Sequence, residues 1–566
     1  MARNDLTPVL ARPREQWASK IGVILAVAGS AVGLGNFLRF PGVAATNGGG
    51  VFMIPYFISL LILGIPICWV EWSIGRYGGA RGFNSAPGIL LALWPNRVSK
   101  YLGSLALIIP VGIFMYYVYI EAWCLAYAYD YLSGAMAAYA REAATEQEAV
   151  AAYQRHFADF VGMGENGFLV RGSLQKSVVF LVIVFIINFV LIYRGLTKGI
   201  EMFSKVAMPL LILFAVMVLV RVLTLGTPNP EQPDKNILNA LGFMWNPKTG
   251  DQTIWQALAN PEMWLYAASQ IFFSLSVGFG IVLNYASYLR SDDDVVLSGL
   301  TASSTNEFCE VCLGGLITIP VAFLFLGPES LNKDVLGSSF SLGFIALPTV
   351  FARMPVGALF GAIWFFMLFL AAITSSLSML QPAIAFFEEG FGMGRRVSVT
   401  CLSMLAAFGS LLVVFFSKNL LALDTMDFWV GGVCIFILAT VEVILAGWVF
   451  GIRNLRDEVS RGAAMRIPGF FWFIIKYVSP TYLLVIFGLW VYYNLPTRIQ
   501  DIRSMSSEDR GTVLLILSFL TVLLICFGLL INLAGKRWRA EGRLDGLTGR
   551  PAPEPRPAVR ERSVIP

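Results

Sequence analysis

The sequence is poor in charge and in the side chains that carry out most metal and hydrolytic chemistry. Charged residues make up 14% of its 566 residues, whereas a soluble globular protein carries about 25%. It contains one histidine, His156, so a metal centre with several histidine ligands is not expected, and neither is a nucleophile activated by histidine. We therefore expect a protein that is neither soluble nor an enzyme, and that needs no organic cofactor.

The cysteines give no sign of a secreted or metal-binding domain. All seven lie in apolar segments, so no extracellular disulfide is predicted. Cys309 and Cys312 form a C-x-x-C pair, a spacing also found in metal and redox sites. No second pair is nearby, and His156 lies in a distant polar segment, so the spacing alone does not predict a metal site.

Long apolar runs are what the sequence has instead. It is 57% hydrophobic, with a mean hydropathy of +0.70. Because roughly 20 apolar helical residues cross a bilayer, we expect an all-α polytopic membrane protein. Apolar runs and turn signals predict twelve spans, at residues 18–45, 50–78, 99–132, 177–194, 200–225, 262–290, 296–326, 357–389, 396–416, 425–451, 467–495 and 510–535.

The basic residues predict the orientation of these spans. Lys and Arg gather in 3–20, 76–100, 194–205, 453–466 and 536–562. These segments fall on one side of the predicted spans, which the positive-inside rule assigns to the cytoplasm. We expect an integral plasma membrane protein, of a bacterial inner membrane, with both termini cytoplasmic. Of the outer loops, 327–355 is apolar enough to fold back as a lid.

Two short stretches interrupt the first and the sixth predicted spans with glycine. They read Val32-Gly33-Leu34-Gly35 and Val277-Gly278-Phe279-Gly280. Their spacing predicts two five-span units, the second inverted because five is odd, and interrupted spans at matching positions indicate a binding site. The expected organisation is a cytoplasmic segment 1–17, a first repeat 18–225, an outer loop 226–261, an inverted repeat 262–451, two further helices 467–535 and a disordered tail 537–566.

An interrupted helix offers polar backbone groups at the middle of a membrane. Freed carbonyl oxygens suit a cation, freed amides suit a carboxylate, and glycine lets a ligand approach closely. Gly29 and Gly33 also fit a small-xxx-small helix-packing pattern, which is the structural alternative. Hydroxyl and amide side chains beside both stretches favour a binding site: Ser30, Asn36, Ser274 and Ser276.

Several long motifs carry a resemblance to a known family. They are GNFLRFP, NGGGVFMIPYF, EWSIGRYGG, YYVYIEAW, QIFFSLSVGFG, SGLTASSTNE and TSSLSMLQP. Together they resemble the neurotransmitter:sodium symporter family, most closely its bacterial leucine-transporter branch, from about Arg14 to Arg537. The resemblance implies a 5+5 inverted repeat with spans 1 and 6 unwound, and sodium-coupled symport by alternating access.

The resemblance also implies two sodium sites. The first would use Ala31, Asn36, Ser274 and Asn306 with the carboxylate of the substrate, so that ion and substrate favour each other's binding. The second would use neutral oxygens only, as suits a singly charged ion, from Gly29, Val32, Ala371, Thr374 and Ser375. Hydrogen bonding between helices is the alternative interpretation of the hydroxyls near Thr374.

The implied substrate pocket points to a neutral amino acid. Its residues would be Ala31, Gly33, Leu34, Gly35, Ile113, Tyr117, Phe273, Ser276, Phe279, Ser375 and Met379. The family's monoamine carriers have an aspartate at the position of Gly33, so glycine there implies a substrate with its own carboxylate. No charged residue lines the side-chain end of the pocket. Ile113 and Met379 depart from the leucine-transporter branch, so leucine is not assumed; aliphatic amino acids are expected first and aromatic ones second.

Charged residues complete the expectations taken from the family. Glu310 stands where chloride-dependent members have serine, which implies chloride independence and a carboxylate able to exchange a proton. Glu71 and Glu121 are expected to lie close together. The outer gate would pair Arg39 with Asp427, and the inner gate would pair Arg14 with Glu389.

Other readings stay open at this stage. A channel or uniporter would need an open pore, a membrane enzyme would need clustered catalytic groups, and a sensor would need an output domain. A carrier of another small carboxylate-bearing amine, or an amino-acid-sensing membrane protein of the same fold, is the alternative function. Membrane lipid and a neutral amino acid are the expected partners, and no nucleic acid is expected.

Overall fold

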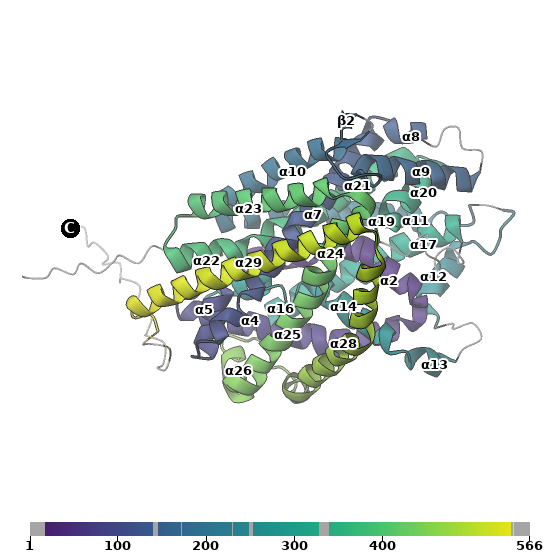
Figure 1. Ribbon diagram of the computed structural model, residues 1–566. Helices are drawn as coiled ribbons and strands as arrows, with labels where there is room; N and C mark the ends of the chain where they lie inside the picture. Colours follow the sequence, from purple (N-terminus) through teal and green to yellow (C-terminus); the bar gives the residue numbers. More distant parts are fainter. Residues whose placement is uncertain are drawn as a thin grey trace, which may run out of the picture.

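Helices make up almost all of the structure (Figure 1). The computed structural model describes residues 17–139, 145–170, 172–228, 230–247, 253–327, 339–544 and 547. Within them lies one two-stranded antiparallel hairpin, β1 (Leu169–Val170) with β2 (Ser173–Leu174). The expected all-helical, multi-pass architecture is confirmed.

Ten helical stretches among the described residues are long and apolar enough to cross a membrane. They are Gly49–Ala80 (α3, α4), Ser99–Leu132 (α6, α7), Lys176–Tyr193 (α10), Leu196–Leu223 (α11), Val295–Phe325 (α16, α17), Gly357–Phe391 (α21, α22), Arg395–Phe415 (α23), Lys418–Val459 (α24, α25, α26), Gly469–Ser504 (α27, α28) and Ser507–Ala540 (α29). Two further helical segments, Lys20–Ala31 (α1) and Gly35–Thr46, would together make an eleventh span. The angle between them is 47°. The second segment ends in α2 (Phe40–Thr46).

The expected span 262–290 consists of two shorter helices, α14 (Pro261–Leu275) and α15 (Ile281–Ala286). Neither is long enough to count as a span alone, so twelve spans and the inverted repeat stay predictions. The break between them falls at the second glycine stretch, as the sequence indicates. Ser276, Gly278 and Gly280 all have positive φ, a conformation that glycine adopts freely and that serine adopts rarely.

The buried centre of the molecule is α7 (Leu105–Leu132), which packs along α21 (Gly357–Met379). Trp123 of α7 and Trp364 of α21 are fully buried. The outer helices are different, because α10 and α29 expose many apolar side chains, such as Val182 and Leu529. Such exposed apolar faces are what a helix needs toward lipid, whereas the α7–α21 seam forms a protein core.

Loop elements gather at the two ends of the helices (Figure 1). At one end lie α8 (Ala135–Tyr139), α9 (Glu146–Val161), α12 (Ile237–Trp245) and α13 (Ile254–Leu258). The loop expected to act as a lid also folds back, because α20 (Leu347–Arg353) buries Leu347 to Phe351 against the protein. Residues 328–338 of that loop lie outside the described residues.

The opposite end holds α5 (Ala86–Leu93), α26 (Ile452–Val459) and the end of α29. Here α29 continues to Ala540, so the first residues of the expected disordered tail are helical. A lysine–arginine-rich last turn favours this extension, because cations interact well with a helix C-terminus. The tail from residue 548 onward lies outside the described residues.

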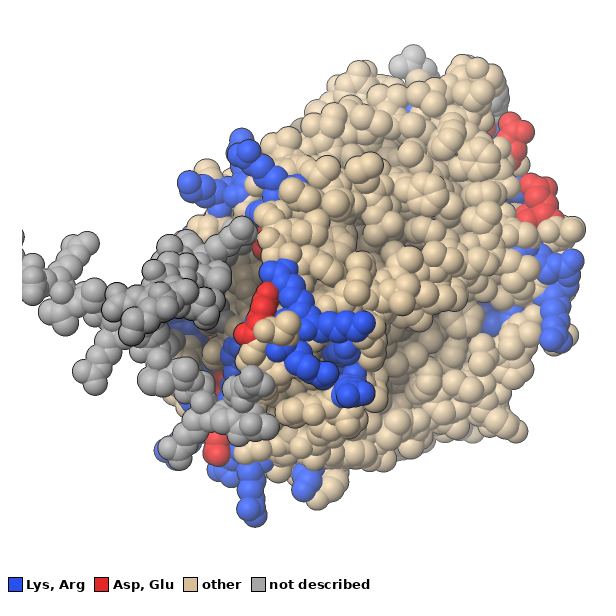
Figure 2. Space-filling view, turned by 60° about the vertical axis from the view of Figure 1, so that its left-hand side comes forward, with Lys and Arg blue, Asp and Glu red and all other residues tan. Residues whose placement is uncertain are grey.

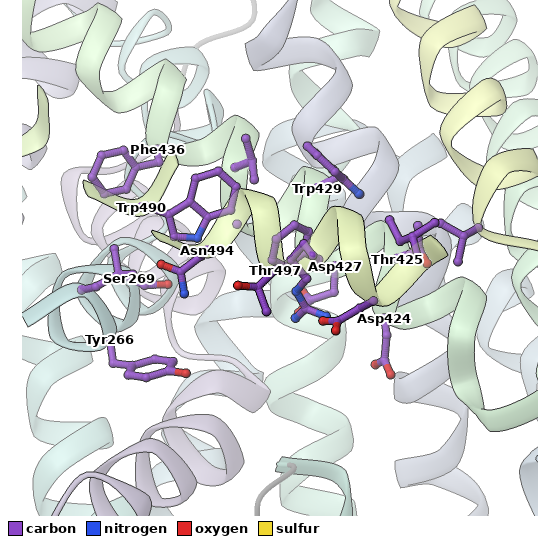
Figure 3. Close-up of a pocket in the computed structure, with 18 of the residues that line it drawn as sticks. Tyr266, Ser269, Asp424, Thr425, Asp427, Trp429, Phe436, Trp490, Asn494 and Thr497 are labelled. Atoms are coloured by element: carbon purple, nitrogen blue, oxygen red, sulfur yellow. The ribbon is translucent and has the colours of Figure 1, made fainter. Parts of the chain in front are cut away.

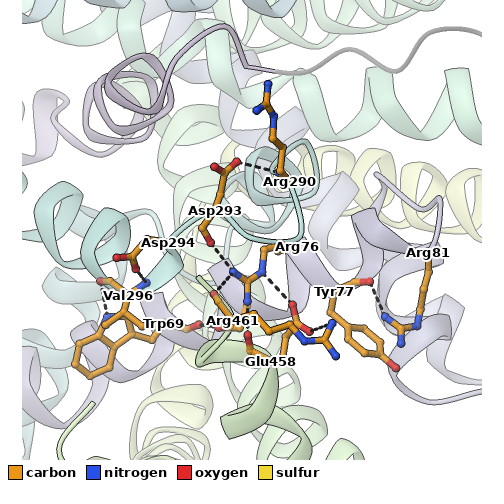
Figure 4. Close-up of polar contacts among 11 residues, drawn as sticks. Trp69, Arg76, Tyr77, Arg81, Arg290, Asp293, Asp294, Val296, Glu458 and Arg461 are labelled. Atoms are coloured by element: carbon orange, nitrogen blue, oxygen red, sulfur yellow. Dashed lines mark hydrogen bonds and ion pairs between the residues drawn. The ribbon is translucent and has the colours of Figure 1, made fainter. Parts of the chain in front are cut away.

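A fully buried arginine ties three segments together at this end (Figure 4). Arg76 of α4 (Ile65–Ala80) donates from Nε to Glu458 Oε1 at 3.0 Å. It also donates to the carbonyls of Glu458, Asp293 (2.5 Å) and Arg461 (2.9 Å). A single guanidinium therefore joins α4 to α26 and to the loop that precedes α16 (Val295–Glu307).

Loss of this guanidinium is expected to destabilise the protein. Arg76→Met would leave a buried carboxylate and three carbonyls without their donor. We expect the free energy of unfolding to fall by about 3 kcal/mol, which is the lower end of the range for a broken buried ion pair. The lower end applies because Arg461 still contacts Glu458 at 3.3 Å. Thermal unfolding in detergent measures the effect. Arg81→Met is the matched control, since Arg81 stacks on Tyr77 (3.4 Å) and is partly exposed. Equal melting temperatures for the two variants would contradict the assigned role of Arg76.

Candidate functional site

The first cluster of oxygen and amide groups lies where the two broken helices meet. Asn36, beside the break that follows α1, accepts from the amide of Gly33 at 2.8 Å, and its side-chain nitrogen lies 2.9 Å from the carboxamide of Asn306. The carboxamide of Asn306 lies 2.6 Å from the Ser274 hydroxyl. With its oxygen toward that hydroxyl, its nitrogen lies 3.3 Å from the Ala31 carbonyl and 3.2 Å from the Ser274 carbonyl. All four residues expected at the first sodium site are therefore adjacent.

The second cluster lies between α1 and α21. Ser375 Oγ lies 3.4 Å from the Gly29 carbonyl and 3.2 Å from the Ala371 carbonyl. The Thr374 hydroxyl lies 3.0 Å from the Ala371 carbonyl, and all of these groups are buried. Four of the five residues expected at the second sodium site are thus in mutual reach. The fifth, Val32, is buried at the end of α1.

The space beside Gly33 is shaped by its missing side chain. A Cβ atom at Gly33 would lie 2.8 Å from both the Tyr117 hydroxyl and Ser375 Oγ, and one at Gly35 would lie 2.9 Å from the Phe273 ring. The Tyr117 hydroxyl accepts from the Leu34 amide at 3.2 Å. Three expected pocket residues, Gly33, Tyr117 and Ser375, therefore converge on one point, and a side chain at Gly33 would occupy it.

Helical spacing and side-chain contacts relate the remaining pocket residues to one another. Ile113 precedes Tyr117 by one helical turn on α7, and Met379 follows Ser375 by one turn on α21, so each lies on the same face as its neighbour. Phe273 and Phe279 approach edge to face with ring centroids 6.0 Å apart. Ser276 Oγ donates to the Ser30 carbonyl at 3.3 Å, which links the two breaks directly.

Glu310 is buried at the edge of the first cluster. Its carboxylate accepts from Gln270 at 2.7 Å and from Asn36 at 3.3 Å. Tyr56 donates instead to the neighbouring Glu307, at 2.7 Å. Sequence reasoning missed Glu307, although its place directly after Asn306 on α16 was a usable signal. Two carboxyl groups, not one, therefore flank this cluster.

The outer gate is not a direct ion pair. Arg39 has no carboxylate within 4.0 Å in the described part of the chain; it donates to Ser269 Oγ at 3.3 Å and lies 4.4 Å over the Phe273 ring. Asp427 accepts from the Tyr116 hydroxyl at 2.6 Å. Both groups instead line a cavity of about 530 Å³. In Figure 3, Tyr266 and Ser269 of α14 and Trp490, Asn494 and Thr497 of α28 (Ser479–Ser504) line it.

The inner gate is only partly within the described residues. Glu389, at the end of α22 (Gln381–Phe391), accepts from the amides of Asn84 at 2.6 Å and Ser85 at 2.8 Å. These amides precede α5, where an anionic group is favoured by the helix dipole. Arg14, its expected partner, lies outside the described residues.

The expected pair of Glu71 and Glu121 does not form. Glu71 accepts from the amide of Gly278 at 2.5 Å and lies in hydrogen-bonding reach of Glu442 on α25 (Ile435–Ile444). Glu121 accepts from Asn188 at 3.0 Å. The physical reason is that Glu71 satisfies a backbone amide freed by the second break, whereas Glu121 is bonded by the side chain of Asn188 on α10.

Comparison with known proteins shows which family the chain matches. Residues 14–535 match the profile of the sodium:neurotransmitter symporter family. An uncharacterised sodium-dependent transporter of Methanocaldococcus jannaschii is 31% identical over 84% of this chain and 89% of its own length. The sodium-dependent serotonin transporter of Drosophila melanogaster is 27% identical over 86% of this chain and 78% of its own.

The structure also resembles a solved one. The crystal structure of MhsT in complex with L-phenylalanine superposes with a TM-score of 0.69 at 26% identity. The match covers 84% of this chain and 99% of MhsT. The likeness therefore extends over most of the chain, and both broken helices lie within residues 14–535, the region that matches the family.

The carboxyl group of Glu71 is expected to matter as a hydrogen-bond acceptor. Glu71→Gln keeps an oxygen for the Gly278 amide and should leave the melting temperature in detergent near that of the wild type. Glu71→Leu leaves a buried amide and the Glu442 carboxyl group without this partner, and each unsatisfied group costs about 1–3 kcal/mol. If leucine is tolerated as well as glutamine, Glu71 does not stabilise the break.

Proposed function

Because the chain belongs to the sodium:neurotransmitter symporter family, we propose that it is a sodium-coupled symporter of neutral amino acids that works by alternating access. The family and the sodium-dependent relatives support sodium coupling. The finer steps, namely two ion sites, the amino-acid substrate and chloride independence, are our proposal. A fixed site between two broken helices, reached in turn from each side, is the arrangement that alternating access requires.

The observation that carries the proposal is the position of Asn36. Its side chain binds the amide of Gly33 and contacts Asn306 of α16 and Ser274 of α14. An ion bound among these oxygens would hold the two broken helices together. The second cluster offers only neutral carbonyl and hydroxyl oxygens, which suit sodium better than a divalent ion, because a divalent ion usually recruits carboxylates.

The substrate class follows from the space at Gly33. A carboxylate placed there would lie beside the Tyr117 hydroxyl, the backbone amides of the break and the first ion cluster. The pocket brings no carboxylate of its own to this point, so the substrate supplies one. The side-chain end, toward Phe273, Phe279 and Met379, is apolar, which favours a neutral amino acid; aliphatic substrates come first and aromatic ones second.

Glu310 supports chloride independence. Its carboxylate lies within reach of Asn36 and Gln270, beside the first cluster, and so supplies negative charge where the chloride-dependent members of the family would use an anion. An amino-acid sensor of the same fold is the second candidate. It would bind sodium and substrate equally well and would transport neither.

Uptake into proteoliposomes tests the function. We expect labelled neutral amino acids to accumulate when sodium is outside, to stay out with potassium or choline, and to enter unchanged when gluconate replaces chloride. A panel of unlabelled competitors, including leucine and phenylalanine, identifies the preferred side chain. Uptake that ignores sodium would refute symport, and sodium-dependent binding without uptake would favour the sensor.

The two ion clusters are tested by removing one hydroxyl from each. Ser274→Ala and Thr374→Ala should each raise the sodium concentration for half-maximal uptake about tenfold, which corresponds to about 1.4 kcal/mol. Thr440→Ala is the matched control, because its hydroxyl bonds only the Phe436 carbonyl of its own helix, at 2.8 Å. If neither variant differs from the control, the ion sites are misplaced.

The carboxylate contact is tested on α7. Tyr117→Phe should raise the KM for the amino acid by about 10- to 100-fold, because a hydrogen bond to a charged group is worth about 1.5–3 kcal/mol. Tyr119→Phe is the control on the same helix, since its hydroxyl contacts Val161 and Ser177, each at 3.2 Å. An unchanged KM for Tyr117→Phe would place the substrate carboxylate elsewhere.

A further inference from the structure

Four basic side chains gather at the cytoplasmic end of the molecule with no acidic partner. They are Arg97, Lys100 of α6 (Ser99–Leu102), and Lys536 and Arg539 of α29. The charges of Arg97, Lys536 and Arg539 all act on the Lys100 ammonium. None of the four has a carboxylate within 4.0 Å in the described part of the chain. We call this group the basic cluster.

Neighbouring basic residues at the same end are satisfied within the protein. Arg537 pairs with Glu541 at 2.6 Å, Arg76 with Glu458 at 3.0 Å, and Arg543 donates to the Gly82 carbonyl at 2.5 Å. Like charges held together repel one another unless an anion or salt screens them. The basic cluster therefore differs from these paired residues, because within the described part of the chain no carboxylate compensates its positive charge.

The basic cluster lies where the lipid-facing surface of α29 ends. Leu529 and Leu533 are 62% and 52% exposed, and Lys536 follows them on the same helix face, seven and three residues further on. Exposed apolar side chains on a peripheral span face the acyl chains of lipid. The ammonium of Lys536 is thus placed at the level where acyl chains give way to headgroups, as lysines at span ends usually are.

Packing holds α6 and α29 together at this level. The Tyr101 hydroxyl donates to Asn532 at 3.1 Å, and Tyr101 is itself 39% exposed, as interfacial tyrosines are. Gly535 is buried, and a Cβ atom there would lie 2.6 Å from Lys100 Nζ. The glycine therefore lets the Lys100 side chain lie directly across α29, which fixes its charge beside Lys536 and Arg539.

We propose that the basic cluster binds the phosphate of an anionic phospholipid of the cytoplasmic leaflet, whose acyl chains lie along Leu529 and Leu533. Figure 2 shows lysine and arginine side chains gathered on this end of the molecule. A phosphate brings the missing negative charge, and the adjoining exposed leucines provide the apolar contact that a free anion would not use. The site binds a lipid and is separate from the transport site between the broken helices.

Native mass spectrometry of the delipidated full chain tests the proposal. The probes are phosphatidylglycerol and phosphatidylcholine with the same acyl chains. We expect phosphatidylglycerol to bind the wild type at least tenfold more tightly than phosphatidylcholine. The variant Arg97→Gln, Lys100→Gln, Lys536→Gln, Arg539→Gln should lose that preference. A matched variant with the same change in charge, Arg396→Gln, Arg453→Gln, Arg456→Gln, Arg466→Gln, alters exposed basic residues of other cytoplasmic segments and should keep it.

Two further arms keep the test decisive. Thermal unfolding in neutral detergent checks that the variants fold. If the fourfold variant does not, the double variant Lys536→Gln, Arg539→Gln, whose side chains are exposed, should weaken phosphatidylglycerol binding at least threefold. Inorganic phosphate at the same concentration should not displace the lipid. Displacement by phosphate, equal losses in the cluster and matched variants, or equal binding of the two lipids would each overturn the proposal.

Discussion

Helix breaks inside a membrane must have every freed backbone group bonded, because lipid offers no hydrogen-bonding partner. In this protein, side chains from other parts of the chain meet that need. The Gly33 amide binds Asn36, the Leu34 amide binds Tyr117 of α7, and the Gly278 amide binds Glu71 of α4. Hydrogen bonding to the two breaks therefore determines where Asn36, Tyr117 and Glu71 lie, and the rest of the bundle packs around these polar side chains.

The same constraint explains why structural and ligand-binding groups coincide. Asn36 cannot be replaced by an apolar residue without releasing the Gly33 amide, and the same side chain approaches Ser274, Asn306 and Glu310. An ion entering this cluster exchanges one set of polar contacts for another in a buried site. Ion binding there would thereby be coupled to the relative position of the two broken helices, which would be the physical basis of a symport cycle in the proposed function.

Local features could be predicted from the sequence, whereas partners from distant helices could not. The glycines at 33, 35, 278 and 280 located both breaks, and the residues of the first ion cluster came together as the resemblance implied. Glu71 was expected close to Glu121, but its neighbour Glu442 belongs to a helix far away in the chain, and no spacing relates the two. The buried role of Arg76 was missed for the same reason, since three of its acceptors are backbone carbonyls, which any residue type provides.

The gates extend this reasoning to movement. Arg39 is held by Ser269 and the Phe273 ring, and Asp427 is held by Tyr116, so each charged group has a partner without the other. Formation of the Arg39–Asp427 pair would exchange one polar contact for another, and such exchanges change the free energy little. Two arrangements of similar free energy are what an element needs if it is to open and close in every cycle. A strong, fully buried pair such as Arg76–Glu458 would be unsuitable there, and it is found instead where α4, α26 and the loop before α16 are fastened together.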